Sequence, residues 1–299
     1  MYAEIALPVV SEKNKLFLQK TPGSQRATLK IKQAQTIEKI IKPAKQVMAF
    51  YDLAKQQRTK LVVTIKLDIF KELTTAQLKK TLVYFANEDS YIRKSAYLAV
   101  GKIYFENKNL QPQIITQLNI LQLQDDYKIR QTVINAAGEI GKKNFEAVQH
   151  FFDKGLSDPH YSPRNAVIGS MKKMGEVNPL PVLKWAGSYL NHEDKEIRRE
   201  MCHGIELRGR RYPQDILPLL KELQHDKTAR VRSTLVHVIG QIAYKKGCIE
   251  IVVAHLKSWE NKQLVADALA EIIDVHRRYR NFSTLTRDEA RQYISDNYK

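Results

Sequence analysis

One stretch of the chain brings a histidine and a carboxylate within reach of each other. His203 and Glu206 are three residues apart in a segment with helical spacing, so their side chains lie on one side of a helix. Such a pair can form a small acid–base unit, because imidazole titrates near neutral pH and a carboxylate can orient it. The same spacing is also typical of a plain hydrogen-bonded surface pair, and the sequence leaves both interpretations open.

Metal binding is a further chemistry to which histidine and cysteine are suited. The spacing of His192, Cys202 and His203 does not place three ligands on one helix face, and no Cys-x-x-Cys or His-Glu-x-x-His motif accompanies them. The sequence also contains no glycine-rich phosphate loop and no Gly-x-Ser-x-Gly motif. We therefore expect neither a metal site nor a cofactor.

Cations recur in clusters from residue 142 onward. Each cluster is a pair or triplet near the C-terminal end of a predicted helix, and the members are Lys142, Lys143, Lys172, Lys173, Arg208, Arg210, Arg211, Lys245, Lys246, Arg277, Arg278 and Arg280. A single cation at a helix C-terminus interacts favourably with the helix dipole, but doubled and tripled cations exceed that need. In a stacked repeat they form a strip along one edge, which predicts salt-sensitive binding of a phosphate backbone with little sequence specificity.

A repeated pair of helices is expected to position these clusters. Apolar spacing predicts first helices near residues 75–87, 111–122, 145–155, 179–190, 213–224 and 248–259, and second helices near residues 90–106, 127–143, 162–175, 195–209, 229–246 and 261–279. An earlier helix is predicted from about Lys60 to Glu72, although the β-branched run of residues 61–65 leaves a strand open. Pro43 is expected to end one helix and to begin the next.

An acidic turn and an arginine mark the start of five predicted second helices. The aspartates are Asp89, Asp126, Asp158, Asp194 and Asp226, and the arginines are Arg93, Arg130, Arg164, Arg198 and Arg232. Successive arginines are 37, 34, 34 and 34 residues apart, which defines a stacked two-helix repeat. We expect each arginine to pair with the aspartate of its own or a neighbouring turn and so to belong to the scaffold, because a guanidinium can bind a carboxylate through two hydrogen bonds.

Glycines keep the same register. One set lies eight residues after a repeat arginine and a second set lies eleven after it: Gly101, Gly138 and Gly240, then Gly141, Gly175 and Gly209. Glycine inside a helix costs about 1 kcal/mol relative to alanine. The first set therefore predicts a close approach between neighbouring units, and the second set is typical of a helix end.

Composition favours an all-α protein with a polyanionic partner. The chain of 299 residues is 43% hydrophobic, has only 12 Gly and 10 Pro, and carries a formal charge of +17 with a pI near 9.7. The alternative explanation of this positive charge is a proteome that is merely rich in lysine, or a set of solvated helix faces. No apolar run is long enough to span a membrane, no secretory signal is evident, and two cysteines fit reduced thiols. We expect a cytoplasmic monomer.

The two ends of the chain differ from the repeats. Residues 1–28 are predicted to be a basic N-terminal segment, residues 29–280 the repeat array, and residues 281–299 a capping helix. Thr286 and Glu289 have the spacing of a capping box at the start of that helix, and Leu285 and Ile294 are expected to face inward.

An aspartate followed by Ile or Val and Arg, in units of about 34 residues, resembles the HEAT and HEAT-like repeat family over residues 74–280. The resemblance implies a right-handed superhelical α-solenoid of stacked antiparallel helix pairs, in which the second helices line a concave face. It says little about function by itself.

Residues 190–247 resemble the HEAT-like-repeat DNA alkylation repair glycosylases. The residues that carry this resemblance are Arg198-Arg199, His203-Gly204, Arg208 and Val231-Arg232-Ser233. The family implies hydrolysis of the glycosidic bond of alkylated purines on bent duplex DNA. His203 stands where the family pattern has Glu, and Gly240-Gln241 stands where it has Asn-Asp. Substitute carboxylates would be Glu200, Glu206 and Asp194, and the aromatic residues that would stack on a base or line the core are Trp185, Tyr189, Tyr212 and Trp259.

Two functions are thus predicted. The first is binding of nucleic acid, with duplex DNA favoured, through the basic strip in a protein related to alkylation repair. The second is a non-catalytic scaffold that holds an acidic protein segment on its concave face. Whether the chain is an enzyme stays open at this stage, with Glu200, His203 and Glu206 as candidates.

Overall fold

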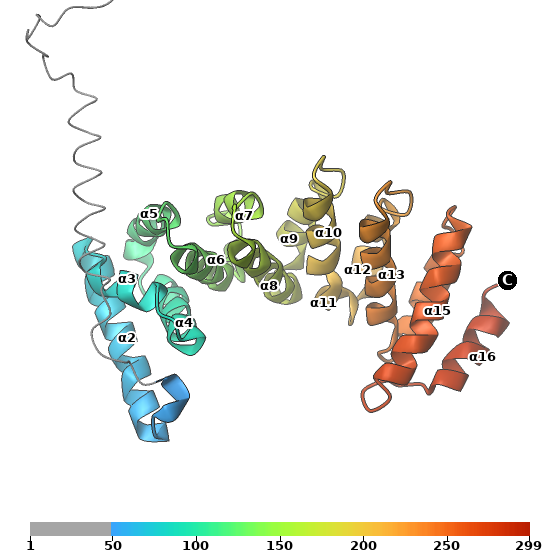
Figure 1. Ribbon diagram of the computed structural model, residues 1–299, viewed down its shortest axis with the longest axis horizontal. Helices are drawn as coiled ribbons and strands as arrows, with labels where there is room; N and C mark the ends of the chain where they lie inside the picture. Colours follow the sequence, from blue (N-terminus) through green and yellow to red (C-terminus); the bar gives the residue numbers. More distant parts are fainter. Residues whose placement is uncertain (1–48) are drawn as a thin grey trace, which may run out of the picture. The chain divides into compact units, whose positions relative to one another are not determined.

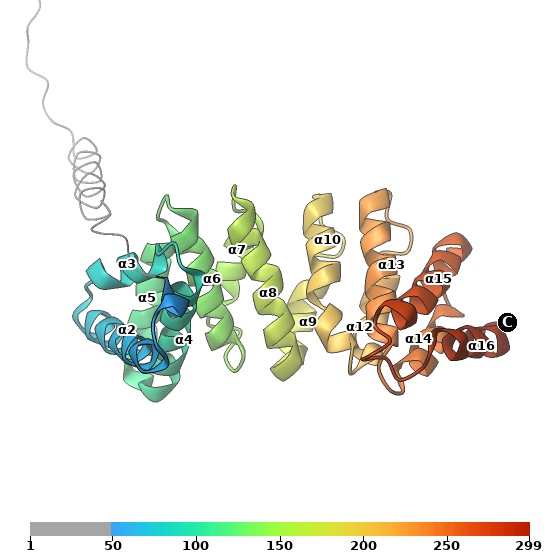
Figure 2. The ribbon, with the colours of Figure 1, turned by 60° about the horizontal axis from the view of Figure 1, so that its bottom comes forward.

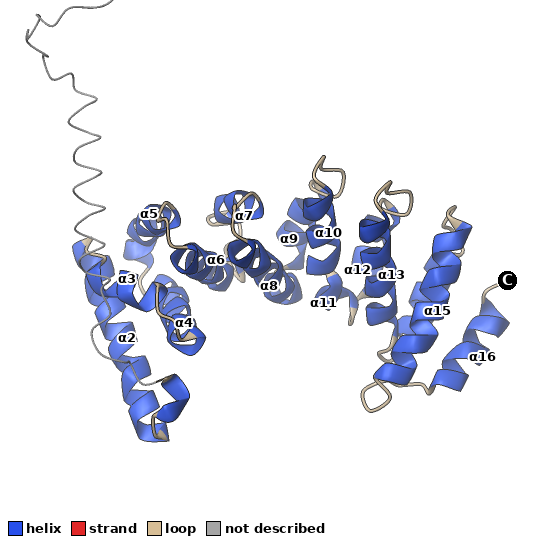
Figure 3. Ribbon diagram, viewed as in Figure 1, coloured by secondary structure: helices blue, strands red, loops and turns tan. Residues whose placement is uncertain are grey.

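The computed structural model describes residues 49–299, which form one unit that is separate from residues 1–48. The described residues fold into helices joined by short loops, and no strand occurs among them (Figure 3). This confirms the expected all-α class. The basic segment 1–28 and the helix expected before Pro43 lie outside the described residues. Of the helix expected directly after Pro43, only the part from residue 49 onward is described, and it contains the short 3-10 turn η1 (Phe50–Asp52).

Helices of two kinds alternate along the chain (Figure 1). The first helices are α3 (Lys79–Phe85), α5 (Gln111–Gln122), α7 (Gln149–Leu156), α9 (Pro179–Gly187), α12 (Pro213–Lys221) and α14 (Cys248–Leu256). The second helices are α4 (Ser90–Glu106), α6 (Tyr127–Gly141), α8 (Tyr161–Val177), α10 (Lys195–Gly204) with α11 (Glu206–Gly209), α13 (Ala229–Ala243) and α15 (Lys262–Arg278). Before them lies α2 (Lys55–Thr75), η2 (Lys108–Leu110) precedes α5, and α16 (Arg287–Asn297) follows.

The second helices stand side by side in one row, with the first helices behind them (Figure 2). Each second helix packs on the next one. The first helices α3, α5, α7 and α12 pack on the second helix of their own pair, whereas α9 packs on α8 and α14 packs on α13, the second helices of the preceding pairs. The arrangement of residues 49–299 is that of a HEAT-like solenoid, in which each unit buries its apolar faces against its neighbours.

The helix predicted from about Lys60 to Glu72 is present as α2, and the β-branched run of residues 61–65 is helical, because Ile65, Ile69 and Leu73 are spaced four apart and are all buried on one side of it. Two details differ from the sequence-based prediction. The helix expected over 195–209 is interrupted at Ile205, between α10 and α11. Several first helices are shorter than expected, and α12, for example, ends at Lys221.

The core is continuous along the row and depends on close contacts at small residues. A Cβ atom added at Gly155 of α7 would lie 2.5 Å from Ile134 Cδ1 and 2.7 Å from Val167 Cγ2. A Cβ atom at Gly138 would lie 2.7 Å from Ser170 Cβ, and one at Gly101 would lie 2.6 Å from Glu139 Cβ. The expected close approach of neighbouring second helices at these glycines is therefore present.

The last helix lies at the end of the row. α16 packs on α15 and α14 (Figure 2), and it buries Ala290 and Ile294. Thr286 and Glu289 form both hydrogen bonds of a capping box at its start.

Within residues 49–299, no helix is both long enough and apolar enough to cross a membrane.

We predict that Gly138→Ala lowers the free energy of unfolding by roughly 1–3 kcal/mol, because the new methyl group would overlap the Cβ of Ser170 in a packed interface. Gly169→Ala in α8 is the matched control, since nothing lies within 4 Å of a Cβ there. That control should gain up to about 1 kcal/mol from helix propensity. Urea titrations followed by circular dichroism measure both changes, and equal stabilisation by the two substitutions would contradict the proposed contact.

Candidate functional site

The antiparallel helix pairs give residues 49–299 two different edges. The turns between a first helix and its second helix lie on one edge, which we call the turn edge. The C-terminal ends of the second helices and the N-terminal ends of the next first helices lie on the other, which we call the basic edge. This arrangement follows from the short connections between consecutive helices (Figure 2).

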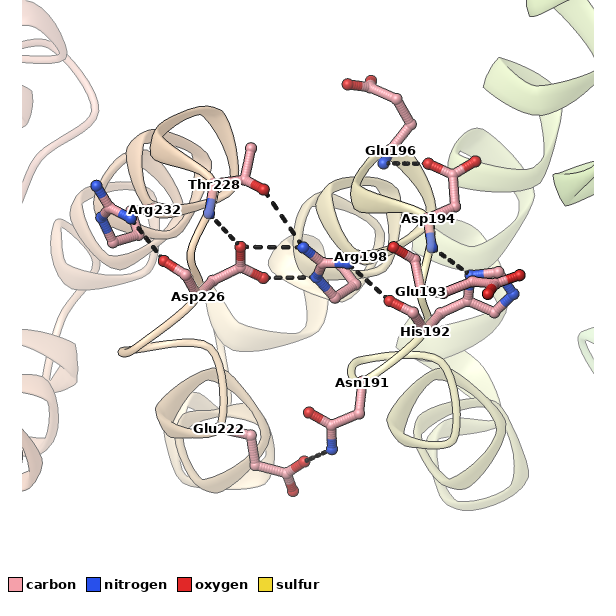
Figure 4. A network of polar contacts seen from close by, with 10 residues as sticks. All are labelled: Asn191, His192, Glu193, Asp194, Glu196, Arg198, Glu222, Asp226, Thr228 and Arg232. Atoms are coloured by element: carbon pink, nitrogen blue, oxygen red, sulfur yellow. Dashed lines mark hydrogen bonds and ion pairs between the residues drawn. The ribbon is translucent and has the colours of Figure 1, made fainter.

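Arginines at the turn edge bind their own turn and, at two places, the next one. Arg198 donates two hydrogen bonds to Asp226, from Nε to Oδ2 at 2.5 Å and from Nη2 to Oδ1 at 3.1 Å (Figure 4). Arg130 binds Asp158 in the same way, at 2.7 Å and 3.0 Å. The side chains of both aspartates are only 4% exposed. Arg198 Nη1 also donates to the carbonyl oxygens of residues 192 and 193, as Figure 4 shows for the first of them.

The aspartates of the turns are of two kinds, whereas the sequence pattern treats them as one. Asp158 and Asp226 lie six residues before their repeat arginine and accept hydrogen bonds from the arginine of the preceding unit. The second kind lies four residues before the arginine and caps its own helix through a backbone N–H two residues on; its members are Asp89, Asp126 and Asp194. Asp194 therefore stabilises the start of α10 without pairing with a repeat arginine.

We call the repeat arginines and the aspartates that bind them the ladder. Three of its arginines, Arg93, Arg164 and Arg232, have no aspartate bound through two hydrogen bonds. Each donates to a carbonyl oxygen of its own turn, as Arg232 does to Asp226 O at 2.6 Å. Arg164 also approaches Glu200, with 4.0 Å between Nε and Oε1. The expectation of an aspartate partner for every arginine is therefore too broad.

Several cations of the predicted strip are held by carboxylates of the same chain. Lys142 Nζ lies 2.6 Å from Glu139 Oε2. Arg208 Nη2 lies 2.6 Å from Asp215 Oδ2. Arg277 and Arg278 contact acidic residues of α15. For these members the strip is partly neutralised by its own surroundings.

Other cations of the strip have no carboxylate within ion-pair distance among the described residues. They are Lys143, Lys173, Arg211, Lys245, Lys246 and Arg280. Lys143 lies 5.3 Å from the centroid of the Phe105 ring, and Lys173 lies 5.7 Å from that of Tyr97. Burial lowers the pKa of Lys173. Five of the six stand just beyond the C-terminal end of a second helix, on the basic edge, whereas Lys173 lies inside α8, four residues before its end at Val177.

First helices begin at this same edge without a side-chain cap. This holds for α5, α7, α9, α12 and α14, and a proline stands in the first turn of α5, α9 and α12. Second helices, in contrast, begin at the turn edge with side-chain caps in α4, α6, α8, α10 and α15. The N–H groups at the starts of the first helices are thus not used by side-chain caps and carry the positive end of the helix dipole.

A polar cluster lies on the row of second helices between α8 and α13. Glu206 is 2% exposed, and its Oε2 lies 3.1 Å from His203 Nε2 and 3.2 Å from Lys172 Nζ. Its Oε1 accepts a hydrogen bond from Arg210 Nη2, and the same nitrogen donates to Gln241 Oε1 at 2.9 Å. Both oxygens of this carboxylate are therefore occupied.

Three positive or neutral donors set the charge state of Glu206. Burial alone would raise the pKa of Glu206, but the hydrogen bond from His203 and the charges of Lys172 and Arg210 lower it to about 2. The carboxylate is therefore ionised at neutral pH and acts as a fixed counterion. It is not placed to exchange a proton with His203 in the manner of an acid–base unit.

His237 of α13 is the residue of this cluster that sequence reasoning missed. Ligand atoms of His203, Glu206 and His237 lie within 4.8 Å of one another, so they could hold a metal ion. Lys172 Nζ lies 2.9 Å from His203 Nε2 and faces the same carboxylate, so an ammonium already supplies the positive charge there. The three residues singled out for metal binding from the sequence are not brought together, and Cys202 is fully buried in the core.

Glu200 has the opposite electrostatic character. It is 3% exposed, and burial raises its pKa, although Arg199 and Arg164 partly oppose this effect. Its Oε2 has no hydrogen-bond partner among the described residues. Glu200 and Glu206 are therefore two buried carboxylates with opposed pKa shifts.

Most of the aromatic candidates belong to the core. Trp185 is 4% exposed and donates its indole N–H to Asp153, which also accepts from the Tyr189 hydroxyl. Trp259 is 1% exposed. Only Tyr212 presents a large exposed ring, 42% accessible, and the Arg208 guanidinium lies 3.8 Å from its centroid.

No protein-family model matches the chain, and no curated protein matches it in sequence. Among solved structures, AlkD2 from Streptococcus mutans is similar at 15% identity and a TM-score of 0.41, over 70% of this chain and 96% of that one. The protein smu.31 from Streptococcus mutans UA159 is similar at 16% identity and a TM-score of 0.41, over 70% of this chain and 96% of that one. Computationally designed armadillo repeat proteins for modular peptide recognition are similar at 17% identity and a TM-score of 0.32, over 64% of this chain and 97% of theirs. Likenesses this low say nothing about what the chain binds.

We predict that Arg198→Met lowers the free energy of unfolding by roughly 2–4 kcal/mol at neutral pH, because it leaves the buried Asp226 carboxylate without its partner. Burial would raise the pKa of Asp226, but Arg198 and the Thr228 N–H lower it below its ordinary value. The contribution of the pair is thus present above the ordinary pKa of about 3.9 and is lost as the pH falls through the lower folded-state value.

The matched control is Arg232→Met, whose guanidinium has no ion-pair partner among the described residues. Urea titrations at several pH values should show a smaller cost for the control, and a cost of Arg198→Met that shrinks in acid. A pH-independent cost would contradict the ion pair.

We predict that Glu206→Gln costs about 3 kcal/mol of unfolding free energy at neutral pH, since the folded-state pKa of about 2 is well below that of the unfolded chain. The cost should disappear as the pH falls from about 4 toward 2. Glu200→Gln is the control, because a raised folded-state pKa makes its charged form unfavourable and the substitution neutral or stabilising. Equal destabilisation by both variants, measured by urea unfolding, would refute this assignment.

Proposed function

We propose that the protein binds the phosphate backbone of a nucleic acid, with duplex DNA favoured, along the basic edge of its helical repeat. The observation that carries the proposal is the recurrence of cations without carboxylate partners among the described residues, at one edge, in successive units. Successive phosphates of a backbone offer a matching series of charges, and lysine and arginine gain affinity by releasing counterions.

The helix starts at the same edge support the proposal. The first helices α5, α7, α9, α12 and α14 present N-terminal N–H groups that side chains leave uncapped. A helix N-terminus favours a phosphate through these donors and through its dipole. Cations and helix starts thus act on the same side of the molecule, although a helix start on its own would not define a site.

The distribution of charge between the edges also favours a polyanion. Residues 49–299 contain 40 Lys and Arg against 29 Asp and Glu. Aspartates that define the repeat are concentrated at the turn edge, where they cap helices or bind arginines. The aspartates of the repeat pattern therefore lie away from the unpaired cations and do not neutralise them.

The proposal is for binding, with no catalytic step assigned. Both oxygens of Glu206 are engaged by cations and by His203, so this carboxylate is not free to position a water molecule or to stabilise a cationic sugar. Gln241, at the place where the resembling glycosylases have an acidic residue, is buried and holds Arg210. An acidic protein segment is the second occupant that unpaired cations would accept.

We predict that the triple variant Lys143→Gln, Arg211→Gln, Lys246→Gln binds a duplex of about 20 base pairs more weakly. The slope of log affinity against log salt concentration should fall by about 2 to 3, at roughly 0.9 per lost phosphate contact. Fluorescence anisotropy at several salt concentrations measures both quantities. A poly-glutamate peptide of equal charge is the second probe, and tighter binding of this peptide would favour the protein-scaffold function.

The control removes three positive charges from the other ends of the repeats. Lys154, Lys184 and Lys257 stand at the C-terminal ends of α7, α9 and α14, are exposed, and have no ion-pair partner among residues 49–299. The corresponding triple Lys→Gln variant has the same net charge as the first one. Equal loss of DNA affinity in the two variants would indicate a general charge effect and refute a specific edge.

A further inference from the structure

A cavity at the basic edge lies between two equivalent loops. One loop joins α11 to α12 and the other joins α13 to α14, and the cavity between them has a volume of about 720 Å³. Six of the residues that line it are Arg210, Arg211, Tyr212, Tyr244, Lys245 and Lys246. Each member of the first loop is 34 residues from its counterpart in the second, so the repeat itself brings them together.

Positive charge dominates this cavity. Four of its lining residues are cations, whereas Glu176 is the acidic residue among them. Arg210 is bound to Glu206, but Arg211, Lys245 and Lys246 have no carboxylate within ion-pair distance among the described residues. A single anionic group with several oxygens, such as a phosphate, is the ligand that three cations around one cavity favour.

Aromatic rings stand beside these cations. Tyr212 is 42% exposed, and the Arg208 guanidinium lies against its ring and holds it in place. Tyr244 is held by parallel stacking on Tyr279, with 5.4 Å between ring centroids. An exposed ring of fixed orientation is a surface on which a base can stack, whatever its sequence identity.

The start of α14 completes the cavity. Cys248, the first residue of this nine-residue helix, lines the cavity, and Gly247 before it adopts a left-handed backbone with φ of 75° and no side-chain cap. The dipole of α14 therefore adds a partial positive charge next to the side chains of Lys245 and Lys246.

We propose that this cavity binds one nucleoside monophosphate unit, with the phosphate held by Arg211, Lys245 and Lys246 and the base stacked on Tyr212. Two sources supply the same chemistry: the phosphorylated end of a nucleic-acid strand, and a free nucleotide. The strand-end source rests on the proposed function, since it requires that nucleic acid lie along the basic edge. The free-nucleotide source does not.

The test is a calorimetric titration of the full chain with AMP, adenosine and inorganic phosphate as separate probes. AMP should bind more tightly than either partial probe, because only AMP engages both the cations and the ring. Tyr212→Leu should weaken AMP binding about tenfold, the order of one stacked base, and leave phosphate binding unchanged. Lys246→Gln should weaken AMP and phosphate binding alike.

The control for loss of an exposed tyrosine is Tyr161→Leu at the turn edge. Tyr161 is 62% exposed, and its substitution should not change the binding of any probe.

A second arm compares duplexes with a one-nucleotide overhang ending in a 5′-phosphate or a 5′-hydroxyl. Preference for the phosphate, lost in Tyr212→Leu, supports the strand-end source; AMP binding without this preference supports the free nucleotide.

The two proposals fail in different ways. If AMP does not bind and the two duplex ends bind equally, the nucleotide cavity is overturned, even when the wild-type chain binds duplex DNA. If AMP binds and duplex DNA does not, the cavity stands and backbone binding fails.

Discussion

At two joints of the array, a buried ion pair between the arginine of one second helix and the aspartate of the next turn ties neighbouring units together. Arg198 fixes the backbone of its own turn and the carboxylate of the next, so one side chain orients two units at once (Figure 4). A carboxylate buried this deeply is costly without its partner. At these two joints the turn edge therefore fixes how one unit sits on the next, while the opposite edge keeps cations such as Arg211 and Lys246 that have no carboxylate partner among the described residues.

Close helix contacts work together with these ion pairs. Gly138 brings α6 against Ser170 of α8, while the ladder arginine of α6 pairs with Asp158 at the start of the same interface. Because both constraints act at the same pair of helices, the lateral position of each unit is set within narrow limits. The cavity between the loops after α11 and α13 owes its shape to this fixed spacing rather than to a special segment of its own.

Much of this organisation could be predicted from the sequence, because it is periodic. Arginine spacing indicated the helix pairs, and glycines at fixed phase indicated where neighbouring helices touch. The sequence around each turn could not show that Asp158 and Asp226 bind a neighbouring unit whereas Asp194 caps its own helix. The two kinds of aspartate differ only by two residues in their distance from the repeat arginine. Contacts between residues far apart in the sequence could not be predicted either. His237 lies beside His203 and Glu206 only because the units stack, and the exposure of Tyr212 depends on how α11 meets α12.

The ladder is not uniform, and this has a mechanical consequence. Bidentate pairs join α6 to the turn before α8, and α10 to the turn before α13, whereas Arg164 of α8 has only a 4.0 Å approach to Glu200 of α10. Stiff joints thus alternate with a softer one along this part of the array. A pulling force applied to the two ends of residues 49–299 would be shared unequally, because bidentate pairs resist separation at the turn edge only between α6 and α8 and between α10 and α13. The described part of the chain would then behave as a row of units clamped at two places rather than as an even coil.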